Sequence, residues 1–87
     1  MSEQNLRELI DRLRNEVAAL PVGDVDARSR LEKIISELED RLENDEVAQA
    51  HGLKGSIQDT IHQIEARHPD ATTVLNNIMM TLANMGI

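Results

Sequence analysis

The histidines and carboxylates in the third quarter of the chain are the side chains with the most chemical potential. Asp59, His62 and Glu65 follow one another at intervals of three residues, so neighbouring members share a face if this segment is a helix. Imidazole and carboxylate groups together form zinc sites. Two or three such groups on one exposed helix are more often a solvated face, so we expect no metal here and keep metal binding as an alternative.

His68 comes directly before Pro69. A residue before proline is driven out of the α region, so His68 should end a helix. We expect its ring to cover the edge of the core and its nitrogens to bond last-turn carbonyls or the turn at Asp70. A pH-sensitive interface is the alternative for this residue. A metal-binding or small-ligand-binding site made of His62, His68 and nearby carboxylates is the alternative for the protein.

No recognised catalytic motif surrounds these groups. The serines have no histidine in an elbow or triad arrangement. The stretch Gly52-Leu53-Lys54-Gly55-Ser56 lacks both the spacing and the preceding strand of a phosphate-binding loop. His51 lies in a polar connection and is expected to be a loop residue. We therefore predict that the protein is not an enzyme and holds no cofactor.

Composition narrows the class of partner. The chain has 87 residues, a formal net charge of -7, no cysteine and no aromatic residue. An acidic chain without rings to stack on bases is disfavoured for direct nucleic-acid binding. Disulfides are excluded, and a domain this short has a small core. Self-association is therefore the expected means of adding to that core.

Neither a secretory signal nor a membrane span is predicted. The first residues, Met1 to Asn5, have no basic and apolar leader pattern. Asn and Thr interrupt the longest apolar stretch every few positions, so it is too short for a span. We expect a soluble, cytoplasmic protein that does not bind membranes.

Apolar residues recur at helical spacing in four segments. The predicted helices cover residues 3–20, 26–43, 53–67 and 71–85. Their apolar stripes are Leu6, Ile10, Leu13, Val17 and Leu20; Leu31, Ile34, Ile35, Leu38 and Leu42; Ile57, Ile61, Ile64 and His68; and Ala71, Leu75, Ile78, Leu82 and Met85. Polar residues that suit helix N-caps precede three of the segments, namely Ser2, Asp24 or Asp26, and Asp70.

The connection from Glu43 to Gly55 is acidic and contains two glycines. Gly52 and Gly55 each cost about 1 kcal/mol inside a helix relative to Ala, which favours a loop. The alternative is one continuous helix through this region, because Leu42 and Leu53 are eleven residues apart and eleven residues fit three turns.

Short turns and a near-3.5 spacing of the stripes predict the fold class. We expect an all-α protein of four short helices in two antiparallel hairpins, coiled-coil-like in packing and crossing at about 20°. We expect dimerisation to complete this single helical domain, which spans residues 1–87.

The C-terminal segment is set apart by its lack of charge. No charged side chain follows Asp70, although 29% of the whole chain is charged. Interface centres are depleted in charge and enriched in Met. We predict a homodimer interface made of Thr73, Val74, Asn77, Ile78, Met80, Thr81, Asn84 and Met85. The alternative is that this helix is the central helix of a monomer.

Two motifs resemble a known family of small bacterial proteins, domain of unknown function 4404. Its pattern combines a Leu-rich first helix, a Phe-Glu-x-x-His-Pro segment and an ending Leu-Ala-x-Met-Gly-Ile. The matching residues are Glu65, His68, Pro69, Leu82, Ala83, Met85, Gly86 and Ile87. Ile64 departs from the aromatic of that pattern. The resemblance implies a bacterial, cytoplasmic, helical protein and implies no activity.

From these observations we expect a small interaction or structural module that associates with itself. The acidic face of the second predicted helix would be available to another, unidentified protein. An acidic adaptor that mimics nucleic acid is a further alternative.

Overall fold

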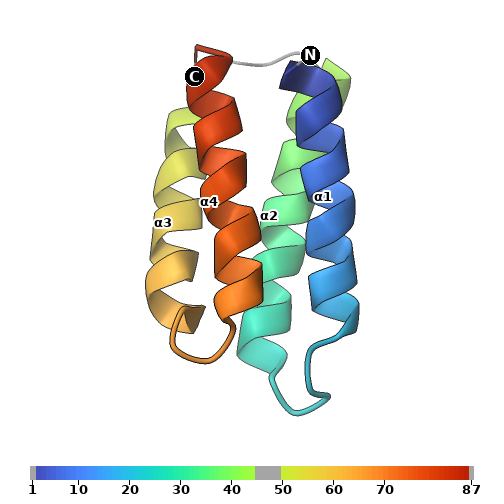
Figure 1. Cartoon of the computed structure of the whole chain (residues 1–87), viewed down its shortest axis with the longest axis vertical. Coiled ribbons are helices and arrows are strands. Elements are labelled where there is room, and N and C mark those ends of the chain that lie inside the picture. The colour runs from blue at the N-terminus through green and yellow to red at the C-terminus, as the bar shows by residue number, and fades with distance from the viewer. Residues whose placement is uncertain (1, 45–49, 87) are drawn as a thin grey trace.

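The recurrence of apolar residues at helical spacing produces four helices in the part of the chain that the structure describes. The computed structural model describes residues 2–44 and 50–86. Within them the helices are α1 (Ser2–Ala18), α2 (Val25–Asn44), α3 (Ala50–Ile64) and α4 (Pro69–Asn84), and no strand is present in these ranges. Figure 1 shows the helices alternating in direction, with the start of α1 and the end of α4 at the same end of the molecule. The predicted all-α bundle of two antiparallel hairpins is confirmed.

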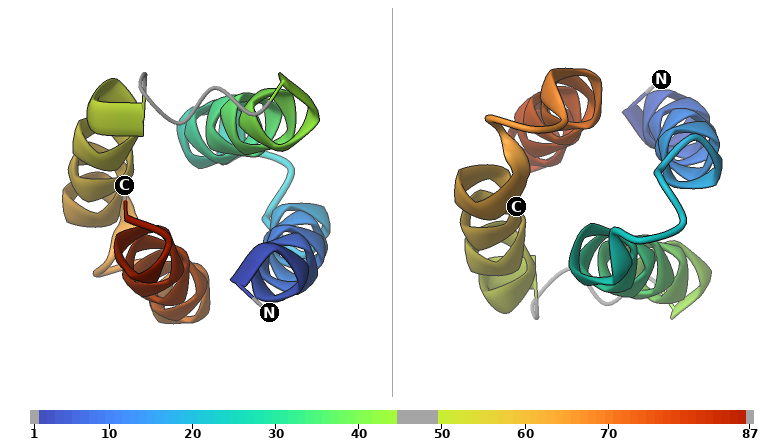
Figure 2. Two further views of the ribbon diagram at one scale, coloured as in Figure 1. Left: turned by 90° about the horizontal axis from the view of Figure 1, so that it is seen from above. Right: turned by 90° about the horizontal axis from the view of Figure 1, so that it is seen from below.

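Each helix packs against two neighbours. The contacting pairs are α1 with α2, α2 with α3, α3 with α4, and α4 with α1, of which α1 with α4 is the most extensive. Seen from either end, the four helices therefore surround one central core (Figure 2). The molecule measures 35 × 21 × 19 Å along its principal axes.

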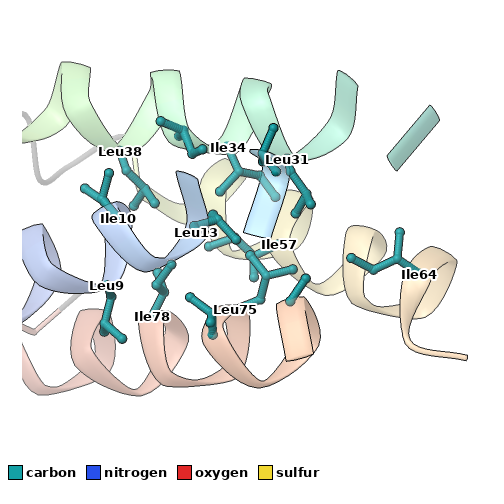
Figure 3. Packing of buried hydrophobic residues seen from close by; sticks show 14 of the residues in the cluster. Leu9, Ile10, Leu13, Leu31, Ile34, Leu38, Ile57, Ile64, Leu75 and Ile78 are labelled. Atoms are coloured by element: carbon teal, nitrogen blue, oxygen red, sulfur yellow. The ribbon is translucent and has the colours of Figure 1, made fainter. Parts of the chain in front are cut away.

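The predicted apolar stripes face this core. Buried side chains come from all four helices, and the most completely enclosed are Leu13, Leu31, Ile34, Leu38, Leu53, Ile57, Ile64, Leu75, Ile78 and Leu82. Figure 3 shows Leu9 and Leu13 pointing toward Leu75 and Ile78 across the α1–α4 contact. Burial of such side chains stabilises the fold by about 1.5–3 kcal/mol each before the entropy cost is counted.

The third stripe differs from the prediction at Ile61 and at His68, which lies beyond the end of α3. Thr60 is buried in the core, whereas Ile61 is only half-buried. The buried residues Leu53, Ile57, Thr60 and Ile64 step by four, three and four residues, which is the spacing of one helical face. The Thr60 hydroxyl donates to the carbonyl of Ser56 at 2.9 Å. This bond satisfies the hydroxyl, so the core tolerates it.

The loop expected from Glu43 to Gly55 is shorter in the structure. α2 continues to Asn44, and α3 already begins at Ala50, so His51, Gly52 and Gly55 are helical rather than loop residues. The part of the predicted connection at residues 45–49 lies outside the described residues. A single straight helix through this region is excluded, because α2 and α3 pack side by side in opposite directions (Figure 1).

The turn between α3 and α4 also departs from expectation. α3 ends at Ile64, and α4 begins at Pro69 with His68 as its N-cap, so Asp70 is the second helical residue and not the cap. Proline suits the first position because its fixed φ is helical and its missing N–H has no partner to lose there. The carbonyl of His68 accepts the N–H of Thr72 at 3.1 Å and begins the helix.

At the other ends the predicted signals hold. Asp24 precedes α2, and its Oδ1 accepts the N–H of Ala27 at 3.3 Å, which makes Asp24 the N-cap among the two aspartates considered. Gly86 follows α4 with a positive φ of 86°, the conformation in which glycine ends helices. Ser2 lies within α1, whose cap is outside the description.

Candidate functional site

After Asp70 in its first turn, the outward face of α4 is uncharged. Packing against the other helices buries Ala71, Val74, Leu75, Ile78 and Leu82, and this leaves polar or small residues on the opposite side. Asp70 is the only charged residue between Pro69 and Asn84. Met80 lies in the middle of this outward face and is 65% exposed, which makes it one of three large apolar side chains so exposed in residues 2–44 and 50–86.

The structure divides the sequence-predicted interface residues into two groups. Val74 and Ile78 lie in the core of the single chain and are closed to a second molecule, and Met85 is half-buried against the core. The remaining five are exposed or half-buried on the outer side, namely Thr73, Asn77, Met80, Thr81 and Asn84. The candidate surface on α4 therefore contains fewer residues than the sequence predicts.

The surface is extended by α1, which the sequence pattern did not reveal. A groove of about 280 Å³ runs between the two helices. Its lining residues, here called the α1–α4 groove, are Asn5, Glu8, Leu9 and Arg12 of α1 and Asn77, Met80, Thr81 and Asn84 of α4. The exposed positions of α1 could be read from its periodicity, but no pattern along one helix identifies the neighbour that packs beside it.

Glu8 and Arg12 are the two charged residues in the α1–α4 groove. They stand four residues apart, where an ion pair along the helix is expected. Glu3 and Arg7 do form such a pair, at 3.3 Å. Across the described residues, by contrast, neither Glu8 nor Arg12 has an ion pair or a side-chain hydrogen bond. Both charges are exposed and available.

A second group of polar side chains joins the two turns at the opposite end of the bundle. Nε2 of His68 lies 2.5 Å from Oδ2 of Asp24, and a guanidinium nitrogen of Arg67 lies 3.6 Å from Oδ1 of the same carboxylate. Both His68 and Asp24 are largely shielded from solvent. The sequence predicts bonds from His68 to last-turn carbonyls or to the turn at Asp70. The ring instead reaches the N-cap of α2.

This environment lowers the pKa of the Asp24 carboxyl below its usual range. The largest cause is the hydrogen bond with His68; burial opposes it, and the N–H of Ala27 and the charge of Arg67 add to the lowering. The carboxylate form is therefore held by three partners, of which His68 and Arg67 come from the turn between α3 and α4 and Ala27 from the first turn of α2. This cluster is well suited to fixing the turns in place.

The histidines considered as metal ligands are not gathered into a site. His62 and Asp59 are exposed on α3, and Glu65 is exposed in the turn that follows it, while His68 is directed to Asp24. In the ranges 2–44 and 50–86, no group of three or more His, Asp or Glu residues is arranged to hold a metal ion. The same ranges contain no helix with the length and apolar character needed to cross a bilayer.

The family resemblance seen in the sequence is supported by comparison with known proteins. The family model described as Domain of unknown function (DUF4404) matches residues 6–87, which is nearly the whole chain. No curated protein and no solved structure matches the chain. The motif residues have structural roles here, because Pro69 begins α4, His68 bonds Asp24 and Gly86 ends the last helix. Ile87 lies outside the described residues.

Proposed function

We propose that this chain, which belongs to the Domain of unknown function (DUF4404) family, is a non-enzymatic helical interaction module that forms a homodimer through the outer face of α4. The observation that carries the proposal is Met80, which is 65% exposed on a face of α4 that has no charged residue after Asp70. Charged residues make up 29% of the chain. A face with so few charges has the composition of an interface centre, where charged residues are depleted.

Self-association would also compensate for the small size of the core by burying additional apolar surface. One cluster of aliphatic side chains fills the space between the four helices, and neither disulfides nor aromatic residues reinforce it. A second copy that covers Met80 would remove further apolar surface from water. Methionine is adaptable in shape and suits a surface that repacks on association.

The environment of Asp24 supports a structural role over a catalytic one. A general acid needs a carboxyl whose pKa is raised by burial or by a like charge. The pKa of Asp24 is instead lowered, chiefly by the hydrogen bond with His68. Both groups of this pair are already engaged with each other across two turns.

The cytoplasmic location, the bacterial source and the acidic face of α2 as a site for another protein stay predictions.

The test of this proposal is the molar mass in solution. Light scattering over a concentration series should give twice the chain mass of 9.7 kDa at high concentration and the chain mass on dilution. Met80→Glu should lower the mass toward 9.7 kDa at every concentration while helical content by circular dichroism stays the same, because the side chain lies outside the core.

The matched control is Val22→Glu. Val22 is 90% exposed at the turn between α1 and α2, so the same change of an apolar side chain to a carboxylate is made away from α4. This variant should retain the dimer. A constant mass of 9.7 kDa for the unaltered protein, or an undiminished dimer for Met80→Glu, would refute the proposal.

A further inference from the structure

The residues of the α1–α4 groove are arranged so that the groove complements itself. Resting on the proposed self-association, we infer that two copies pair face to face through this groove about a twofold axis that is perpendicular to the helices and passes near Met80. In this arrangement Glu8 of each copy pairs with the partner's Arg12. The occupant of the groove is therefore a second copy of the same chain.

The charges on α1 give the first argument. Glu8 and Arg12 both line the groove, and neither has an ion-pair partner among residues 2–44 and 50–86. Four residues along a helix span about 6 Å. A twofold axis that crosses α1 midway between them reverses the direction of the partner's α1. Glu8 then faces the partner's Arg12, and the reciprocal pair forms at the same time.

The amides on α4 give a second argument that does not depend on charge. Asn77 and Asn84 line the same groove and lie three residues before and four residues after Met80. The same axis therefore places Asn77 opposite the partner's Asn84 and Met80 opposite the partner's Met80. An amide carries both donors and an acceptor, so two amides can hydrogen-bond each other. The apolar Met80 side chains fill the centre between the two amide pairs.

The other twofold arrangement of the same faces is less favourable. An axis parallel to the helices would place α1 against the partner's α4. Glu8 and Arg12 of one copy would then face the amides and Met80 on the partner's α4, and the two charges would have no opposite charge across the interface. Partly burying two charges without pairing them costs more than leaving them in water. The perpendicular axis avoids this cost.

The available surface is large enough for a stable pair. One long side of the molecule measures 35 Å by about 20 Å, which is on the order of 700 Å². Standard specific interfaces cover about 600–1,000 Å² on each partner. The side formed by α1 and α4 reaches this range only if the pair uses most of its length. This length extends past both Glu8 and Arg12 on α1.

A single introduced cysteine locates the axis, because the chain contains no cysteine of its own. Met80→Cys should form a covalent dimer under mild oxidation, since residues near a twofold axis meet their own copies and a disulfide needs Cα atoms roughly 4.4–6.8 Å apart. Val22→Cys is the matched control, because Val22 is more exposed but lies at the end of the bundle. It should remain monomeric in a denaturing, non-reducing gel.

Charge reversal tests the reciprocal pairs. Glu8→Arg and Arg12→Glu should each weaken dimerisation by about tenfold, because each places like charges opposite each other twice in the dimer. The double variant should recover affinity to within about threefold of the unaltered protein. Arg7→Glu is the control: it makes the same charge change on α1 as Arg12→Glu, but Arg7 lines a different groove, and its effect on dimerisation should be small.

The outcomes separate this inference from the proposed function. A monomeric unaltered protein would overturn both. A dimer in which Met80→Cys does not cross-link, or in which the double charge reversal is weaker than either single variant, would overturn the twofold arrangement and leave self-association standing. Cross-linking at Met80 together with recovery in the double variant would support the arrangement.

Discussion

Asp24 and His68 are 44 residues apart in the sequence, and a hydrogen bond of 2.5 Å joins Oδ2 of Asp24 to Nε2 of His68. Asp24 is the N-cap of α2 and His68 is the N-cap of α4, so the bond connects the turn of the first hairpin to the turn of the second. Aliphatic contacts have little directional preference, so this bond adds a directional constraint to the packing of one hairpin against the other.

Removing the hydrogen bond between Asp24 and His68 should destabilise the protein. Asp24→Ala loses both the bond to His68 and the cap on the N–H of Ala27, so we expect the midpoint of thermal unfolding to fall by roughly 5–10 °C. His68→Ala loses only the bond between the turns and should have about half that effect. Asp26→Ala is the control, because Asp26 is exposed and pairs only along its own helix with Arg30. Equal midpoints for Asp24→Ala and Asp26→Ala would contradict the assigned role.

The lowered pKa of Asp24 makes part of the stability dependent on pH. A carboxyl whose pKa is lower in the folded state stabilises the fold above the pKa of the unfolded chain, about 3.9, and loses this contribution as the pH falls through the folded value. The free energy of unfolding should therefore decrease below about pH 4 partly because of this group.

Asp24→Asn isolates this contribution, because asparagine is also a good N-cap but does not ionise. Urea unfolding should show the unaltered protein more stable than Asp24→Asn at pH 6, with the difference shrinking steadily between about pH 4 and pH 2. A difference that is constant over this range would mean that the charge of Asp24 contributes nothing to stability.

Much of the fold could be predicted because it depends on local spacing. The stripes through Leu13, Leu31 and Leu75 follow from the helical period alone, and these side chains are fully buried. Short turns at Pro21 and Pro69 then require antiparallel hairpins. The packing of α1 beside α4 could not be predicted in this way, because it depends on contacts between residues far apart in the sequence.

The errors have physical causes of the same kind. Gly52 and Gly55 are poor helix formers, yet α3 includes both, because burial of Leu53 and Ile57 outweighs a cost of about 1 kcal/mol for each glycine. The bond between Asp24 and His68 could not be predicted from the sequence around either residue, because the two are 44 residues apart. The predicted interface on α4 included Ile78, because a stripe does not reveal which of its edges faces the core.

The centre of the core should be sensitive to loss of volume. Leu75 is fully buried on α4 opposite α1 (Figure 3), and Leu75→Ala should lower the free energy of unfolding by about 2–5 kcal/mol. Such a loss is a large part of the total for a small domain, about 5–15 kcal/mol. Val22→Ala removes apolar atoms from an exposed side chain and should change the free energy of unfolding by less than about 0.5 kcal/mol. Chemical denaturation measures both, and similar losses for the two would contradict the assignment of Leu75 to the core.

The glycines inside α3 predict a gain in stability. A methyl group added at Gly55 would meet no atom within 4 Å, and its backbone is helical. Gly55→Ala should therefore raise the free energy of unfolding by about 0.5–1 kcal/mol, because alanine has fewer conformations to lose on folding.

Gly86 provides the contrast, since it also has open space around it but has a φ of +86°. Gly86→Ala forces an L-residue into the left-handed region and should lower stability by about 1 kcal/mol. The two substitutions add the same methyl group to open space, so opposite signs in thermal unfolding would show that backbone conformation decides the effect. A loss of stability in Gly55→Ala would instead mean that this part of α3 is not helical in solution.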